Sequence, residues 1–126
     1  MKIKEMLRFY FSAEKINSHI DRQILKYACN PEVDALDGAE RISALIDEKG
    51  KLKKLWAYLD GVAGGLKSEE FDALKSYSAM REGLKKLGGD EIKRIRSAGT
   101  KFMRHARRLD SFGKELRLLR RYYCLL

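Results

Sequence analysis

The first stretch of the chain, residues 2–29, reads KIKEMLRFYFSAEKINSHIDRQILKYAC. Two sets of mostly apolar residues recur every seven positions in this stretch, one set beginning at Ile3 and the other at Met6. They correspond to the seam positions of a heptad repeat, which face a packing partner. A seven-residue repeat sustained in this way predicts one long helix with an apolar stripe. The helix is expected to end at Asn30, because Pro31 disfavours helical geometry in the residue before it and has no amide hydrogen.

Four further helices are expected from apolar residues at helical spacing. An acidic connection over residues 31–40 precedes them, and Ser68 and Asp90 are the expected N-caps of the second and third of the four. No segment alternates as a strand would, so the sequence predicts an all-α five-helix bundle. It begins with a long N-terminal helical hairpin and ends in a helix-turn-helix-like basic part. The four predicted helices cover residues 39–62, 68–87, 91–109 and 112–123.

A chain of 126 residues has the size of one domain. We expect residues 1–63 to form the hairpin and residues 66–126 to form the basic helical part of that single domain. No segment has the length and apolar character of a membrane span or a secretory signal, so we expect a cytoplasmic protein without membrane contact. The two cysteines, Cys29 and Cys124, are expected to be buried or half-buried thiols.

The net charge of the chain is +9 and is concentrated near its end. Residues 93–121 contain eleven basic and two acidic side chains, whereas the rest of the chain contains sixteen of each. Such an asymmetry indicates attraction to a polyanion.

The predicted helix over residues 91–109 separates apolar from basic side chains. At ~100° per residue, one stripe collects Ile92, Ile95, Phe102, Met103, Ala106 and Leu109, and the opposite arc collects seven cations with no carboxylate among them. Gly99 is expected to be a site of close packing rather than of ligand binding. A basic helix face of this kind suits the phosphates of a duplex. The candidate nucleic-acid-binding residues, including three from the last helix, are Lys93, Arg94, Arg96, Lys101, Arg104, Arg107, Arg108, Arg117, Arg120 and Arg121.

Catalytic chemistry has little support in the sequence. His19 and His105 have no cysteine or carboxylate at metal-ligand spacing, and the aspartates are scattered without a paired partner. We therefore predict a non-enzymatic protein without catalytic residues, metal or cofactor.

Three segments follow one another in a suggestive order: LKSEEFDALKSY, then the turn LKKLGGDE, then IKRIRSAGTKFMRHARRL. Together they span residues 66–109 and resemble the C-terminal helix-turn-helix of sigma-70-type factors and of small phage regulators related to them. The resemblance implies a DNA-binding transcriptional regulator of phage or mobile-element type. It also implies a DNA-facing helix that carries Lys93, Arg94, Arg96, Ser97, Lys101 and Arg104, followed by phosphate contacts from Arg107 and Arg108.

Double-stranded DNA is thus the expected partner, and two alternatives stay open. The same cations could dock on an acidic protein surface, as in a small phage-type inhibitor of a host protein or nucleoprotein machine, for example an anti-CRISPR-like protein. Independently, residues 3–27 could pair with a second copy in a homodimer, since Asn17 sits at a seam position where a buried amide can fix helix register.

Overall fold

The computed structural model describes residues 3–32, 34–80 and 87–126. Within these ranges the protein is all-α and contains no strand, as the sequence predicted. The elements, in chain order, are α1 (Ile3–Cys29), α2 (Ala35–Ala63), α3 (Ser68–Ala79), α4 (Gly89–His105), the 3-10 helix η2 (Leu109–Phe112), α5 (Gly113–Leu119) and the 3-10 helix η3 (Arg120–Leu125). Among them, no helix is long and apolar enough to cross a bilayer.

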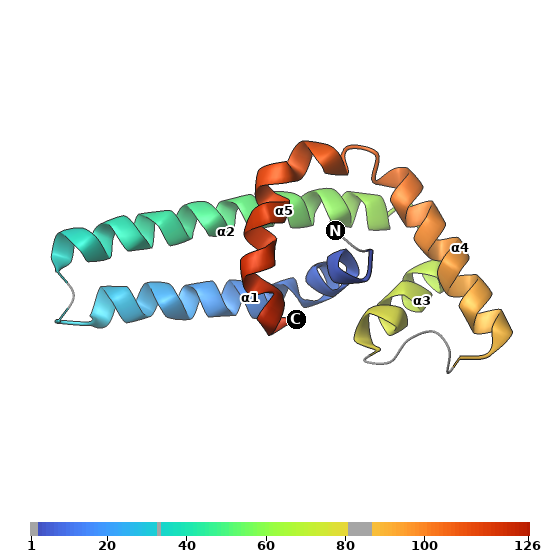
Figure 1. The fold of residues 1–126 in the computed structure, drawn as a ribbon, viewed down its shortest axis with the longest axis horizontal. Coiled ribbons are helices and arrows are strands. Elements are labelled where there is room, and N and C mark those ends of the chain that lie inside the picture. The colour runs from blue at the N-terminus through green and yellow to red at the C-terminus, as the bar shows by residue number, and fades with distance from the viewer. Residues whose placement is uncertain (1–2, 33, 81–86) are drawn as a thin grey trace.

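The long helices α1 and α2 lie antiparallel and form the predicted hairpin (Figure 1). The turn between them is shorter than predicted, because α2 already begins at Ala35. Carboxylates are favourable in the first turn of a helix, and Asp37 occupies that turn. Most of the acidic stretch interpreted as a connection is therefore helical, and Gly38 is buried within it.

A kink interrupts α1 at Ser12, where φ is −125° and ψ is 19°. The first turns of the helix consequently leave the direction of the rest (Figure 1). Kinks of this kind arise where a side chain inserts into the backbone hydrogen-bond ladder. Here the Trp56 indole Nε1 donates to the Tyr10 carbonyl oxygen at 3.0 Å, and the Tyr10 hydroxyl donates to Asp60 Oδ1 at 2.6 Å.

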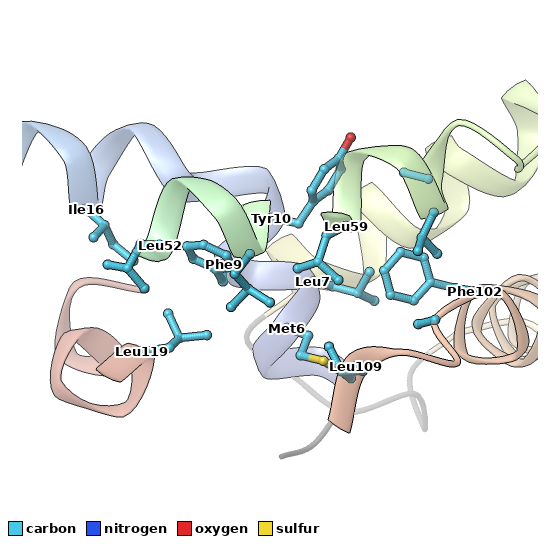
Figure 2. Close-up of a cluster of buried hydrophobic side chains, with 14 of the residues drawn as sticks. Met6, Leu7, Phe9, Tyr10, Ile16, Leu52, Leu59, Phe102, Leu109 and Leu119 are labelled. Carbon is cyan, nitrogen blue, oxygen red and sulfur yellow. The ribbon is translucent and has the colours of Figure 1, made fainter. Parts of the chain in front are cut away.

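One core cluster connects the hairpin with the C-terminal helices (Figure 2). The predicted seam residues Met6 and Ile20 of α1 are fully buried inside it, so their apolar surface is already covered within one chain. The C-terminal helices add to the same cluster, Phe102 from α4 and Leu119 from α5. Part of the seam of residues 3–27 is thus used for folding, whereas Asn17, Ile24 and Tyr27 are half-buried. The homodimer through this seam stays a prediction.

Helix α3 differs from its prediction at both ends. Lys67, not Ser68, is the N-cap, and its backbone N–H donates to Glu70 Oε1 at 2.9 Å. The helix ends at Ala79 rather than near residue 87, and residues 81–86 of the predicted helix lie outside the described residues.

The basic helix α4 is shorter than predicted. It begins at Gly89 with Gly88 as its N-cap, so Asp90 lies in the first turn instead of capping it. It ends at His105, where Ala106 leaves helical geometry with φ −88° and ψ 42°. The predicted last turn, up to residue 109, is therefore a turn followed by η2.

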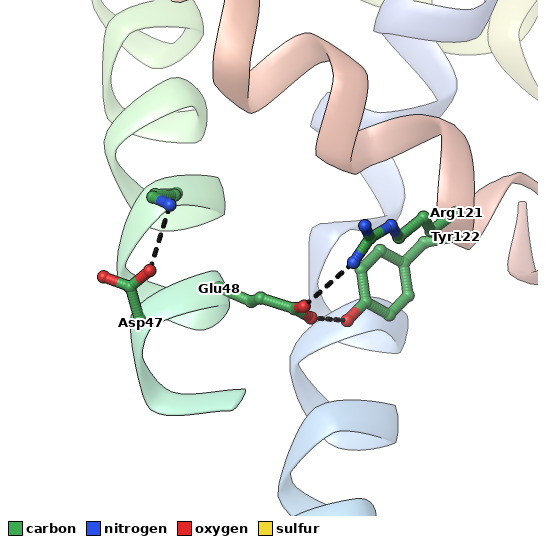
Figure 3. A network of polar contacts seen from close by, with 5 residues as sticks. Asp47, Glu48, Arg121 and Tyr122 are labelled. Carbon is green, nitrogen blue, oxygen red and sulfur yellow. Dashed lines mark hydrogen bonds and ion pairs between the residues drawn. The ribbon is translucent and has the colours of Figure 1, made fainter. Parts of the chain in front are cut away.

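The C-terminal run docks on the hairpin, where α5 crosses the two long helices (Figure 1). Phe112 is the N-cap of helix α5. Tyr122 is buried and its hydroxyl donates to Glu48 Oε2 at 2.5 Å (Figure 3). The cysteines, by contrast, were predicted wrongly. Both are exposed: Cys29 is the last residue of α1, at the tip of the hairpin, and Cys124 lies in the C-terminal 3-10 helix η3.

Candidate nucleic-acid interface

The apolar side of α4 holds the helix against the rest of the protein. Ile95, Ala98 and Phe102 are buried, and α4 packs along α3 (Figure 1). Gly99 is buried too, and a Cβ at this position would lie 3.4 Å from Ile3 Cδ1. The interpretation of Gly99 as a packing site agrees with this contact. Met103 was predicted to join the apolar side but is 40% exposed.

The outer side of α4 carries a hollow of about 430 Å³, here called the α4 hollow. Two rows of residues line it. The residues of each row are four positions apart in the sequence, so they lie above one another on the same face of the helix. The rows are Arg96, Thr100 and Arg104, and Ser97, Lys101 and His105. Cations and hydroxyl groups, the usual donors to phosphate oxygens, therefore share one exposed face of α4.

Lys101 is the one cation of this hollow with a carboxylate partner among the described residues. Its Nζ lies 2.8 Å from Glu70 Oε1 on α3. This hydrogen bond, aided by the backbone N–H of Lys67, lowers the pKa of the Glu70 carboxyl below its ordinary value against the opposing effect of burial. No carboxylate lies among the cations on α4 itself, but Glu70 of the neighbouring helix α3 offsets the charge of Lys101.

Five other predicted cations are exposed and form no ion pair with any residue of the described ranges. Arg96 and Arg104 lie in the α4 hollow, and Lys93 lies on the turn of α4 before it. Arg107 and Arg108 stand in the turn after α4, which is fixed by a hydrogen bond from the Arg108 backbone N–H to the Tyr58 hydroxyl at 2.9 Å. The five residues are named together below as the free cations of α4 and its turn.

Arg94 lies apart from this group. It borders another hollow, of about 410 Å³, together with the acidic residues Glu69, Asp72 and Glu91. Acidic surroundings of this kind disfavour a phosphate at the same place. Arg94 is therefore a weak member of the predicted interface.

The cations of the last helix are also divided. Arg121 is 3.3 Å from Glu48 Oε1 (Figure 3). It also shares a hollow of about 360 Å³ with Arg117, Glu48 and Asp47. Arg120 is exposed. The predicted extension of the basic patch thus faces carboxylates of α2 over part of its length.

Sequence reasoning missed three side chains at these surfaces. Thr100 and His105 line the α4 hollow, and Lys114 lines the hollow between α2 and α5. The spacing of four between Arg96, Thr100 and Arg104 was a signal that could have found the threonine. The His105 ring also approaches the turn after α2, since its Nδ1 would lie 3.8 Å from a Cβ at Gly65.

In the part of the chain that the structure describes, no group of three or more histidine, cysteine or acidic residues has an arrangement that could hold a metal ion. No protein-family model matches the chain, and no curated protein or solved structure is significantly similar to it. Any function has to follow from the surfaces described above.

Proposed function

We propose that this protein is a non-enzymatic nucleic-acid-binding protein that contacts the phosphates of a duplex, DNA in the first place. The observation that supports the proposal is the gathering of cations on one face of α4, with Arg96 and Arg104 in the α4 hollow and further free cations on both sides of it. Because neutralised phosphates release counterions, each such cation adds to affinity without reading sequence.

A transcriptional role of phage or mobile-element type is the finer form of this proposal. It rests on the resemblance of residues 66–109 to sigma-70-type helix-turn-helix proteins. The pairing of α3 with α4 along their length is compatible with that resemblance. Residues 81–86, which would join the two helices of the motif, lie outside the described ranges.

The salt dependence of duplex binding tests the proposal. If each of the five free cations of α4 and its turn neutralises one phosphate, the slope of log affinity against log salt is about −4.5. The double variant R96Q/R104Q should make this slope shallower by about 1.8. The matched control K15Q/K26Q removes the same charge from exposed positions on α1 and should leave the slope close to that of the wild type. Equal slopes for the two variants, or no duplex binding at all, would contradict the proposal.

One observation favours the second candidate function, docking of an acidic protein as an inhibitor would do. An apolar hollow of about 550 Å³ lies beside Arg96 and Thr100, lined by residues such as Leu7, Tyr77 and Met103. A protein partner could place an apolar side chain there and a carboxylate on Arg96. The variant M103K separates the candidates, because a charge in this hollow should abolish docking of a protein and leave duplex binding intact or stronger.

A further inference from the structure

A second hollow, of about 490 Å³, lies between α1, α2 and α3. Aromatic side chains from all three helices border it: Tyr10, Phe11, Trp56 and Phe71. Phe11 and Phe71 meet edge to face with centroids 5.2 Å apart, and Tyr10 stacks on Trp56 with centroids 5.8 Å apart. Tyr10 is buried, whereas the other three are only partly buried and offer ring surface to the hollow. We call this the aromatic hollow.

The rings of the aromatic hollow are fixed before any ligand arrives. The Trp56 indole is tied to the Tyr10 carbonyl at the kink of α1, and the Tyr10 hydroxyl is tied to Asp60. Phe11 follows Tyr10 and precedes the kinked residue Ser12. A rigid aromatic surface loses little side-chain entropy on binding, which favours a planar ligand.

The polar groups that border the aromatic hollow limit the chemical classes of ligand that could bind there. Lys53 and Lys75 are exposed on its border and have no carboxylate partner among the described residues. Asn17 is half-buried there, and its amide makes no hydrogen bond within the same ranges, so both its donor and its acceptor are available. Glu14 is the one carboxylate on the border.

From this arrangement we infer that the aromatic hollow binds an unpaired nucleobase together with its phosphate. Aromatic rings stack on the face of any base, an amide can bond a base edge, and lysines can neutralise the adjoining phosphates. An apolar peptide segment would use the rings and the amide but would offer no negative charge to the two lysines. The inference rests on the proposed function for the class of ligand, yet it shares no residue with the α4 hollow.

Trp56 is the only tryptophan of the chain and reports directly on this hollow. The full-length protein is titrated with a single-stranded oligonucleotide, with an abasic strand of the same length and with a mononucleotide, and Trp56 fluorescence is followed. We expect quenching by the base-bearing strand and none by the abasic strand, which keeps the phosphates but offers no ring to stack. Quenching by the mononucleotide at equal concentration would also support the site and assign it to free nucleotides. Quenching by the abasic strand to the same extent, or by no strand, would overturn the inference.

Variants of the hollow sharpen the test. N17A and F71L should each weaken binding of the single strand by about tenfold, in the range expected for the loss of one stacked or bonded base. The matched control Y27L removes an aromatic ring from α1 outside the hollow and should leave affinity unchanged. Helicity by circular dichroism verifies that each variant is folded. Equal affinity of N17A, F71L and wild type would overturn the inference.

The two proposals can fail separately. R96Q/R104Q should lose duplex affinity and keep the quenching of Trp56 by a single strand. If the wild type shows that quenching and no salt-dependent duplex binding, the base site is supported and the duplex interface is wrong. The reverse result would leave the interface and remove the base site.

Discussion

At the scale of single residues, the contact between Lys101 and Glu70 decides how positive the α4 hollow is. A carboxylate 2.8 Å from the ammonium group offsets its charge at the place where a phosphate would lie. A phosphate at this place would therefore have to compete with Glu70 for Lys101.

Glu70→Gln is expected to strengthen duplex binding. The change removes one negative charge and releases Lys101, while the side-chain oxygen can still accept from the Lys67 backbone N–H. One additional phosphate contact should steepen the salt slope by about 0.9. Fluorescence anisotropy over a salt series measures this. E69Q is the control. It makes the same change of charge at the neighbouring position, where Glu69 does not pair with Lys101. If E70Q and E69Q gave the same salt slope, the release of Lys101 would play no part, and the change in net charge alone would explain the result.

Tyrosine hydroxyls bonded to carboxylates should make the protein sensitive to alkali. Burial, and then the hydrogen bonds to Asp60 and Glu48, raise the pKa of Tyr10 and of Tyr122 well above the ordinary value of 10. The unfolded chain therefore loses these protons near pH 10 while the native state keeps them. The associated stability is complete below pH 10 and is lost as the pH rises above it, by about 1.4 kcal/mol per pH unit for each tyrosine. Urea unfolding at pH 8 and pH 11 measures the loss. Y122F lacks one of these hydroxyl groups, so its free energy of unfolding should decrease less between the two pH values, by the contribution of one tyrosine. A decrease equal to that of the wild type would contradict the role of Tyr122.

At the scale of elements, Gly99 is a glycine in the interior of α4 whose effect on stability can be measured. A Cβ there would meet Ile3 Cδ1 at 3.4 Å, and Ile3 borders the apolar hollow, so the isoleucine has room to move. Gly99→Ala should therefore raise the free energy of unfolding by about 0.5–1 kcal/mol, the usual gain within a helix. Gly50→Ala in α2 is the matched control, since nothing lies within 4 Å of its added methyl group. A loss of stability in G99A beside a gain in G50A would show that the approach of α1 to α4 requires glycine.

The elements also show how far the sequence determines the fold. The repeat of α1 was sufficient to predict one long helix with a buried stripe, because apolar periodicity reflects burial directly. The end of α4 was not predictable, since no proline or glycine stands near residue 105 and the turn depends on Tyr58, fifty positions away in the chain. The kink at Ser12 likewise depends on Trp56 of another helix.

The sequence was sufficient to predict which residues give the candidate site its positive charge. It was not sufficient to predict which of them form ion pairs. Composition alone located the cations between residues 93 and 121. Their partners lie far away in the sequence, 31 positions for Lys101 with Glu70 and 73 positions for Arg121 with Glu48. The aromatic hollow has the same origin, because its rings meet only after three helices have packed.

At the scale of the whole molecule, the hairpin, α4 and α5 should unfold as one unit because they share a single core cluster. Leu119 of α5 is fully buried in that cluster. Leu119→Ala should lower the free energy of unfolding by about 2–5 kcal/mol, the cost of losing buried methyl groups and leaving a cavity. The midpoints from Trp56 fluorescence and from far-ultraviolet circular dichroism should shift together, as in a two-state transition. Leu36→Ala, at a position that is 67% exposed, is the control and should change stability by about 0.5 kcal/mol or less. Two separate transitions in L119A would mean that the C-terminal segment folds independently of the hairpin, and the α4 hollow would then lack the rigid support that phosphate binding through a preformed surface requires.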